Sequence, residues 1–203
     1  MTYKRYENYK DSGVEGIGKM PEHWQQKKLK YLVKTTKGFA FDSNLFEDFG
    51  IPVIKATDIK NGSVQNASSF IDPNLLGEYK NVLLCEDDIL ISTVGSKPEV
   101  INSAVGQVAK VSKEIEGALL NQNTVILRVK TIMEVLRQYM FFPLFSYSFR
   151  KHLDLYAHGT ANQASLSLQD ILEYNLCVPP LQEQQQITKL ITTKSKEIDS
   201  LMY

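Results

Sequence analysis

The chain has 203 residues, of which 43% are hydrophobic, so it can bury a packed core and is not intrinsically disordered. Its 23 Lys and Arg are balanced by 23 Asp and Glu, whereas a protein that holds DNA alone by non-specific charge is normally basic. Either the chain has no nucleic-acid role, or its basic residues are clustered on one face, or a partner supplies much of the contact with phosphates. No apolar run is long enough to span a membrane, and the polar N-terminus lacks a signal-peptide core, so we expect a cytoplasmic protein with no membrane partner.

The first part of the chain reads as a polar arm followed by short strands. Residues 12–23 contain three glycines and one proline, which predicts an extended arm that leads into the domain. A Lys-Asn-Gly turn is expected at 60–62, a helical turn at 72–79 and a solvated turn at 86–88. Runs of β-branched and other apolar residues predict strands at 24–33, 51–59, 87–96, 103–111 and 123–129.

The later part is more helical. Residues 131–156 carry apolar side chains at helical spacing, with a break expected at Pro143. Ser167 and Asp170 have a spacing like that of a capping box, so a short helix should begin there and lead to a last strand ending near 178. The sequence therefore predicts a mixed α/β (α+β) domain over residues 1–178.

From Pro179 onward the sequence predicts a polar, Gln-rich helix that starts at Pro180, because proline is tolerated at a first helical position. Its apolar stripe repeats in steps of four and three, as in a coiled coil. The expected helix–helix interface consists of Ile187, Leu190, Ile191, Lys194, Ile198 and Leu201. A helix folded back on its own domain is the alternative, and residues 179–203 form the second unit of the chain in either case.

No catalytic constellation is visible in the sequence. The three histidines and two cysteines have no metal-ligand spacing, and Gly-rich phosphate loops are absent, so we predict neither a metal site nor a bound cofactor. The Glu-x-Lys at 78–80 resembles part of a nuclease metal site, but Asp72 is its only nearby upstream carboxylate. Cys85 and Cys177 lie in apolar surroundings and are expected to be buried free thiols.

Polar loops rich in amides, hydroxyls and lysines are the remaining candidates for function. Asn and Gln side chains suit the edge of adenine, whereas Lys, Ser and Thr suit phosphates. Each loop taken alone could equally be an ordinary turn. The candidate DNA-contacting residues are Lys37, Lys55, Thr57, Lys60, Thr93, Ser96, Lys97, Asn121, Gln122, Asn123, His158, Thr160, Asn162 and Gln163.

Several segments resemble one known family in the same order along the chain. The opening YKDSGVEGIGKMPEHWQQKKLKYL is similar to the start of target-recognition domains in specificity subunits of type I restriction–modification systems. ISTVGS at 91–96, LNQNT at 120–124 and GTANQASLSLQDILEYNLCVPPLQEQQQI at 159–187 match further landmarks of that family. The resemblance covers essentially the whole chain.

The resemblance implies a non-catalytic subunit that reads double-stranded DNA. In that family a recognition domain is followed by a long helix, and the unit usually occurs twice, so that two antiparallel helices separate two half-sites. Modification subunits bind the assembly, carry S-adenosylmethionine and methylate adenine, while restriction subunits cut or translocate DNA. This chain departs from the pattern because it has one unit and one helix, as expected of a half-size or truncated form that could form a homodimer through its helix.

Two other hypotheses stay open at the level of sequence. The chain could be the recognition domain of a self-contained DNA methyltransferase or nuclease, although methyltransferase motifs are missing. It could also be a protein-interaction module that uses its terminal helix and does not read DNA.

Overall fold

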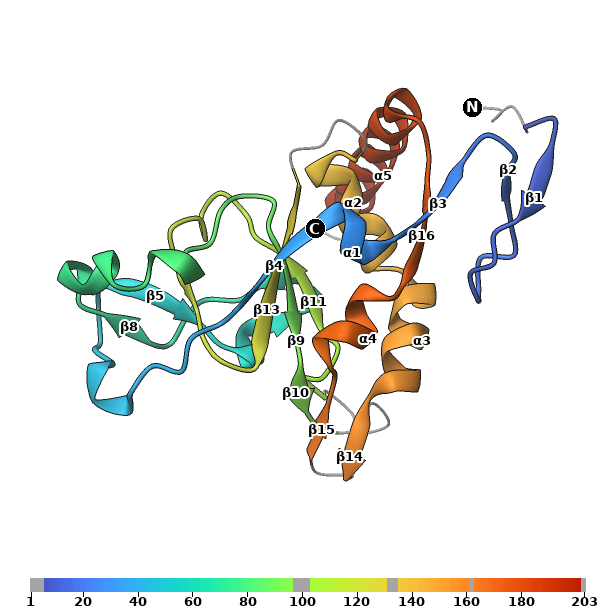
Figure 1. Ribbon diagram of the computed structural model, residues 1–203. Coiled ribbons are helices and arrows are strands. Elements are labelled where there is room, and N and C mark those ends of the chain that lie inside the picture. The colour runs from blue at the N-terminus through green and yellow to red at the C-terminus, as the bar shows by residue number, and fades with distance from the viewer. Residues whose placement is uncertain (1–5, 97–102, 131–134, 161–162, 202–203) are drawn as a thin grey trace.

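The computed structural model describes residues 6–96, 103–130, 135–160 and 163–201, and Figure 1 gives its arrangement. Within these ranges the central element is a six-stranded sheet with the order β4-β13-β9-β11-β7-β6. Its strands are β4 (Val33–Lys37), β13 (Thr124–Val129), β9 (Ile89–Ser92), β11 (Val108–Lys110), β7 (Gly62–Val64) and β6 (Ile59–Lys60). The mixed architecture and the long C-terminal helix expected from the sequence are both confirmed.

The two central strands are apolar throughout because both of their faces are buried. In β9, Ile89 and Ile91 point into one hydrophobic cluster and Leu90 points into another. Ile126 of β13 joins Leu90, since successive side chains of a strand face opposite sides of the sheet. The sheet therefore separates two cores within the described part of the chain.

The first core lies under the helices, on the right of the sheet in Figure 1. It is covered by α2 (Arg137–Leu144), α3 (Tyr147–Tyr156) and α4 (Leu168–Leu172), and by the paired strands β3 (Gln25–Lys28) and β16 (Asn175–Val178). The second core lies in a smaller lobe on the left. Its strands are β5 (Ile51–Ile54), β8 (Phe70–Ile71) and β12 (Leu119–Leu120).

Four of the predicted elements are confirmed. Asn61 and Gly62 both have positive φ and form the two-residue turn between β6 and β7. A 3₁₀ helix, η3, covers Pro73–Gly77, where a helical turn was predicted. β9 with β10 (Val94–Gly95), and β13, correspond to the apolar runs at 87–96 and 123–129.

The single strand predicted at 24–33 is wrong, because the helical turn α1 (Leu29–Leu32) separates β3 from β4. Leu29 and Leu32 are both buried in the first core. In a strand, residues three apart point to opposite faces, whereas a helical turn places them on one side. The burial of both leucines therefore favours the turn.

The strand predicted at 51–59 also divides, into β5, the 3₁₀ helix η2 (Ala56–Asp58) and β6. The buried carboxylate of Asp58 accepts the backbone N–H of Lys55 at 2.8 Å, which stabilises the turn. Only the end of the predicted strand at 103–111 forms a strand, as β11.

The helical break occurs after Pro143, which lies inside α2, and not at this residue itself. Ser146 separates the two helices because its Oγ accepts the backbone N–H of Phe149 at 3.3 Å and so caps α3. Ser167 caps α4 in the same way through the N–H of Asp170 at 3.1 Å, as its spacing predicted.

The turn at 86–88 is not fully solvated as expected, because Asp88 is buried. Its carboxylate accepts a hydrogen bond from Arg128 Nε at 2.7 Å and another from the backbone N–H of Cys85 at 2.9 Å. Asp88 thus joins the start of β9 to the end of β13. Both cysteines are free, and Cys177 is buried, but Cys85 is only half-buried.

The N-terminal arm folds back as a hairpin of β1 (Tyr9–Asp11) and β2 (Lys19–Pro21), so it is more ordered than the extended arm predicted. Val14 and Met20 from this hairpin are buried in the first core. The arm is therefore part of the domain. Across the described residues, no helix combines the length and apolar character needed to cross a membrane.

The C-terminal helix α5 (Leu181–Leu201) begins one residue after Pro180, whose carbonyl accepts the N–H of Gln184 at 3.0 Å. The side chain of Gln184 is fully buried. Its Oε1 accepts the N–H of Leu136 at 2.9 Å, and its Nε2 donates to the carbonyl of Pro179 at 2.8 Å. One side chain therefore links the start of α5 to the start of α2 and the end of β16.

Glu183, beside Gln184, links α5 to the N-terminal arm. Its carboxylate accepts Tyr6 Oη–H at 2.7 Å and Trp24 Nε1–H at 2.9 Å, and it pairs with His23 Nε2 at 2.6 Å. Burial alone would raise the pKa of Glu183, but these hydrogen bonds hold that pKa below its usual value. Burial and the contact with Glu183 raise the pKa of Tyr6 to about 12. We call Tyr6, His23, Trp24, Glu183 and Gln184 the junction.

Replacing Gln184 by alanine should lower the free energy of unfolding by about 3 kcal/mol, because a buried N–H and a buried carbonyl lose their partner. Gln185→Ala is the matched control, since Gln185 is exposed on the next position of the same helix, and should change stability by less than about 0.5 kcal/mol. Urea unfolding of both variants measures the difference. Equal losses would show that Gln184 is not a structural link.

Candidate functional site

The polar loops predicted to be functional meet at one edge of the central sheet. β9 and β4 are both antiparallel to β13, so β9 and β4 end where β13 begins. The register of β11, β7 and β6 brings the turn at 60–62 to the same edge. We call this the loop edge, made of the described residues 37–39, 54–62, 92–96, 103–107, 121–124, 158–160 and 163–165.

The loop Asn121–Asn123 is held against the end of β4 by close backbone contact. A Cβ atom on Gly38 would lie 1.8 Å from the carbonyl oxygen of Asn121, so only glycine fits there. Phe39 N–H donates to the carbonyl of Leu120 at 2.9 Å, and Gln122 N–H donates to the carbonyl of Phe39 at 2.8 Å. The loop is therefore fixed relative to the sheet.

A small sheet extends the loop edge beyond β9. In it β10 pairs with β15 (Gln163–Ser165), which pairs in antiparallel fashion with β14 (His158–Thr160). Gly159 has a φ of 137°, and a Cβ there would lie 2.2 Å from the carbonyl oxygen of Gln163. The paired strands β14 and β15 lie at the bottom of Figure 1, whereas α5 lies at the top.

Thr93 connects these two parts of the loop edge. Its N–H donates to the carbonyl of Asn123 at 2.8 Å, and its carbonyl accepts the N–H of Leu166 at 2.9 Å. The segments ISTVGS, LNQNT and GTANQAS are far apart in sequence, yet they are joined here by backbone hydrogen bonds.

A hollow of about 350 Å³ completes the loop edge on its other side. Thr57, Lys60 and Asn61 line it from η2 and the β6–β7 turn, and Ser103 and Gln107 line it from the segment before β11. Ser103 Oγ also donates to the carbonyl of Ser96, which ties this hollow to β10.

Most of the predicted DNA-contacting residues lie at the loop edge with accessible side chains. The exposed ones are Lys37, Thr57, Lys60, Gln122, Asn123, His158 and Gln163. The half-buried ones are Lys55, Thr93, Ser96 and Asn121. Thr160 ends β14, while Lys97 and Asn162 lie outside the described residues.

Besides Thr57, whose Oγ1 donates to Asp58 Oδ1 at 3.4 Å, two of the predicted residues have close partners inside the protein. Lys55 Nζ donates to Ser69 Oγ at 2.6 Å and lies 4.5 Å from the centre of the Phe46 ring. Asn121 Oδ1 accepts the N–H of Gln122 at 2.8 Å. These contacts shape the loops, and they restrict what either side chain offers to a ligand.

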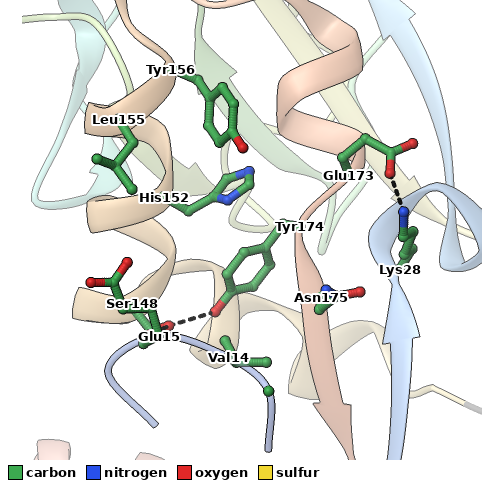
Figure 2. A pocket seen from close by; sticks show the side chains of 11 residues that line it. Val14, Glu15, Lys28, Ser148, His152, Leu155, Tyr156, Glu173, Tyr174 and Asn175 are labelled. Carbon is green, nitrogen blue, oxygen red and sulfur yellow. Dashed lines mark hydrogen bonds and ion pairs between the residues drawn. The ribbon is translucent and has the colours of Figure 1, made fainter.

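A polar pocket lies away from the loop edge, between the arm, α3 and the start of β16 (Figure 2). Its volume is about 320 Å³. Tyr174 Oη–H donates to Ser148 Oγ at 3.1 Å, and Ser148 Oγ–H donates to the carbonyl of Glu15 at 2.6 Å. This chain of hydrogen bonds attaches the arm to α3.

Glu173 at the rim of that pocket pairs with Lys28 and with Lys30, the latter at 2.6 Å. The hydrogen bonds from Lys28 and then Lys30 lower the pKa of Glu173 to about 2. The pairs thus hold β3 and α1 against the end of α4. Glu78 and Lys80 are exposed, and in the described residues no three His, Cys, Asp or Glu side chains gather into a possible metal site.

The predicted interface of α5 divides into two halves. Ile187 packs against the first core, and Leu190 and Ile191 are half-buried. Lys194 forms an ion pair with Glu197 at 2.5 Å, while Ile198 and Leu201 are 57% and 85% exposed. The first half of α5 therefore packs against its own domain, as in the alternative prediction of a helix folded back on that domain. The second half extends away from the domain.

Two features were missed at the level of sequence. Phe39 is exposed beside the loop Asn121–Asn123, although its segment had been selected only for Lys37. The junction joins the Pro-Glu-His-Trp step to the Leu-Gln-Glu-Gln start of α5. The signal for the junction was that polar side chains occur beside Pro21 and Pro180, where an extended arm and a helix start were predicted.

Comparison with known proteins identifies the family. The model of the type I restriction modification DNA specificity domain matches residues 21–201, which is most of the chain. This chain therefore belongs to the family of type I restriction modification DNA specificity domains.

Two curated relatives come from Methanocaldococcus jannaschii. The type I restriction enzyme MjaVIII specificity subunit is 27% identical over 190 residues, covering 92% of this chain and 42% of that protein. The putative type I restriction enzyme MjaX specificity subunit is 22% identical over 209 residues, covering 99% of this chain and 47% of that protein. The chain thus spans about half the length of these relatives.

The fold is also that of a solved structure. The S subunit of a type I restriction-modification system from M. genitalium aligns with a TM-score of 0.61 at 16% sequence identity. The alignment covers 89% of this chain and 41% of that one. At this identity the likeness concerns the fold.

Proposed function

We propose that this chain is a DNA-recognition subunit of a type I restriction–modification complex, which reads one DNA half-site with the loop edge. The observation that carries this proposal is the meeting of three polar regions at one fixed edge of the sheet, namely 92–96, 121–123 and the paired strands 158–160 and 163–165. Residues 1–178 would form the recognition domain, and residues 179–203 would form the spacer helix.

The chemistry of the loop edge suits duplex DNA. Gln122, Asn123 and Gln163 are exposed amides, and an amide donates to and accepts from adenine in the major groove. Lys37 and Lys60 are exposed cations at either end of the same edge and suit phosphates. Because β9, β13 and the small sheet hold these loops, little conformational entropy is lost when DNA binds.

The partners follow from the charge balance and the family. A chain with 23 basic and 23 acidic residues has no net charge, so other subunits would supply much of the contact with phosphates. Modification subunits would dock on the chain, hold S-adenosylmethionine and methylate adenine, and restriction subunits would join them. In this proposal the chain itself is not catalytic and binds no cofactor.

The second half of α5 is the proposed contact with a second copy of this chain. Ile198 and Leu201 continue the four-and-three spacing of Ile187 and Ile191 and are exposed. An antiparallel pair of such helices would give a two-fold dimer that reads a palindromic split site.

The alternative is the recognition domain of a self-contained DNA methyltransferase or nuclease. Its distinguishing property is methyl transfer or DNA cleavage by the purified chain without any other subunit. The family to which the chain belongs favours the first proposal.

Selection from a library of random duplexes at low salt, with and without the modification subunit, tests DNA reading. We expect one split sequence to be enriched, and Gln163→Ala to weaken its binding by about 1–3 kcal/mol while leaving unrelated duplexes nearly unchanged. Gln186→Ala, on the exposed side of α5, is the matched control and should bind as the unmodified chain does.

Enrichment of no duplex in either condition would contradict the proposed function. Equal losses of Gln163→Ala on selected and unrelated duplexes would mean that the paired strands β14 and β15 contact only the DNA backbone. Methylation by the chain alone would favour the alternative.

Ile198→Asp should shift the chain from dimer to monomer, because a carboxylate in the helix–helix seam would be desolvated without a partner. Thr193→Asp adds the same charge at an exposed position outside the seam and should leave the dimer intact. Sedimentation velocity over a range of protein concentrations measures both. A chain that stays monomeric at every concentration, or a dimer insensitive to Ile198→Asp, contradicts pairing through α5.

A further inference from the structure

Phe39 is an aromatic residue at the margin of the second core, with part of its ring exposed. Its side chain is 45% exposed, whereas Phe41, two residues later, is buried in the second core. Removing exposed apolar surface from water is favourable in free energy. The exposed part of this ring could therefore bind an apolar group of a ligand.

The ring is held in one place from two sides. The backbone of Phe39 is bonded to Leu120 and Gln122, and the ring packs against Tyr79 at 5.0 Å and Phe41 at 5.2 Å between centroids. Both contacts are tilted or edge-to-face, which aromatic pairs favour. The ring therefore keeps its position while its outer part remains exposed.

The neighbours of Phe39 are those of a DNA-facing surface. Lys37 lies two residues before Phe39, at the end of β4. Lys80 follows Tyr79 in sequence and is the first residue of the 3₁₀ helix η4 (Lys80–Val82). Both lysines are exposed. Gln122 and Asn123 lie beside it in the bridged loop. Cations and amides thus flank a fixed apolar ring.

Two other exposed aromatic residues, Phe49 and Tyr31, lack these neighbours. Phe49 is more exposed, but it follows Glu47 and Asp48, whose carboxylates would repel phosphates. Tyr31 lies in α1, at the opposite edge of the sheet, since β4 starts there. Phe39 therefore differs from Phe49 and Tyr31 in its position among the amides and lysines of the loop edge.

We propose that Phe39 is a specificity-determining residue that contacts the 5-methyl group of a thymine in the major groove. This methyl group is the apolar feature of the major-groove edges, and aromatic side chains recognise it by contact. The inference rests on the proposed function, and it adds an apolar element to a site otherwise made of amides and lysines. It assigns Phe39 to one base and not to the phosphates.

The test replaces each thymine of the duplex selected by the full chain with deoxyuridine, one position at a time, which removes only the methyl group. With the unmodified chain, one position should weaken binding about fourfold, the worth of burying one methyl group. With Phe39→Ala the thymine duplex should bind more weakly, and deoxyuridine at that position should cause no further loss. Tyr31→Ala is the control and should keep the fourfold effect.

The outcomes separate this inference from the proposed function. Failure to select any duplex contradicts the proposed function itself. A selected duplex in which no thymine responds, or which contains no thymine, overturns the role of Phe39 alone, as does a Phe39→Ala protein that keeps the full methyl effect. If Phe39→Ala does not fold, the deoxyuridine scan of the unmodified chain still overturns the role of Phe39 when no thymine responds.

Discussion

The direction of α5 relative to the sheet depends on two adjacent side chains, Glu183 and Gln184. Glu183 binds three side chains of the N-terminal arm and its following residues, and Gln184 satisfies buried backbone groups of α2 and β16. Buried polar groups that are fully paired favour one arrangement, because any other leaves them without partners. The helix is therefore a rigid extension of the domain, and not an element on a flexible linker.

This junction gives the two ends of the molecule different roles. The loop edge lies at the ends of β4 and β9, and α5 lies at the other side of the sheet (Figure 1). If the domain and α5 form one rigid unit, the position of a half-site bound at the loop edge fixes where Ile198 and Leu201 lie. A pair of such chains would then set the separation of two half-sites by geometry alone.

Local patterns predicted the parts of the fold that depend on local causes. The Asn61–Gly62 turn and the cap at Ser167 are stabilised by neighbours in sequence, and β13 was recognisable from its own apolar run. By contrast, Asp88 is buried because of Arg128, forty positions away in the sequence, and α1 exists because of the core that its two leucines share. The loops of the site were also recognisable one by one. The meeting of these loops at one edge depends on strand register, which was not predictable. The partners of Lys55, Ser69 and Phe46, are brought to it by the fold of the smaller lobe and were not predictable either.

Hydrogen exchange of the full chain, with and without the selected duplex and its modification subunit, tests most directly whether the loop edge reads DNA. Adding the duplex should slow exchange at residues 92–96, 121–124 and 158–165, and leave the exposed half of α5 unchanged. Slower exchange confined to α5 or to the N-terminal arm, with none at the loop edge, would contradict the account.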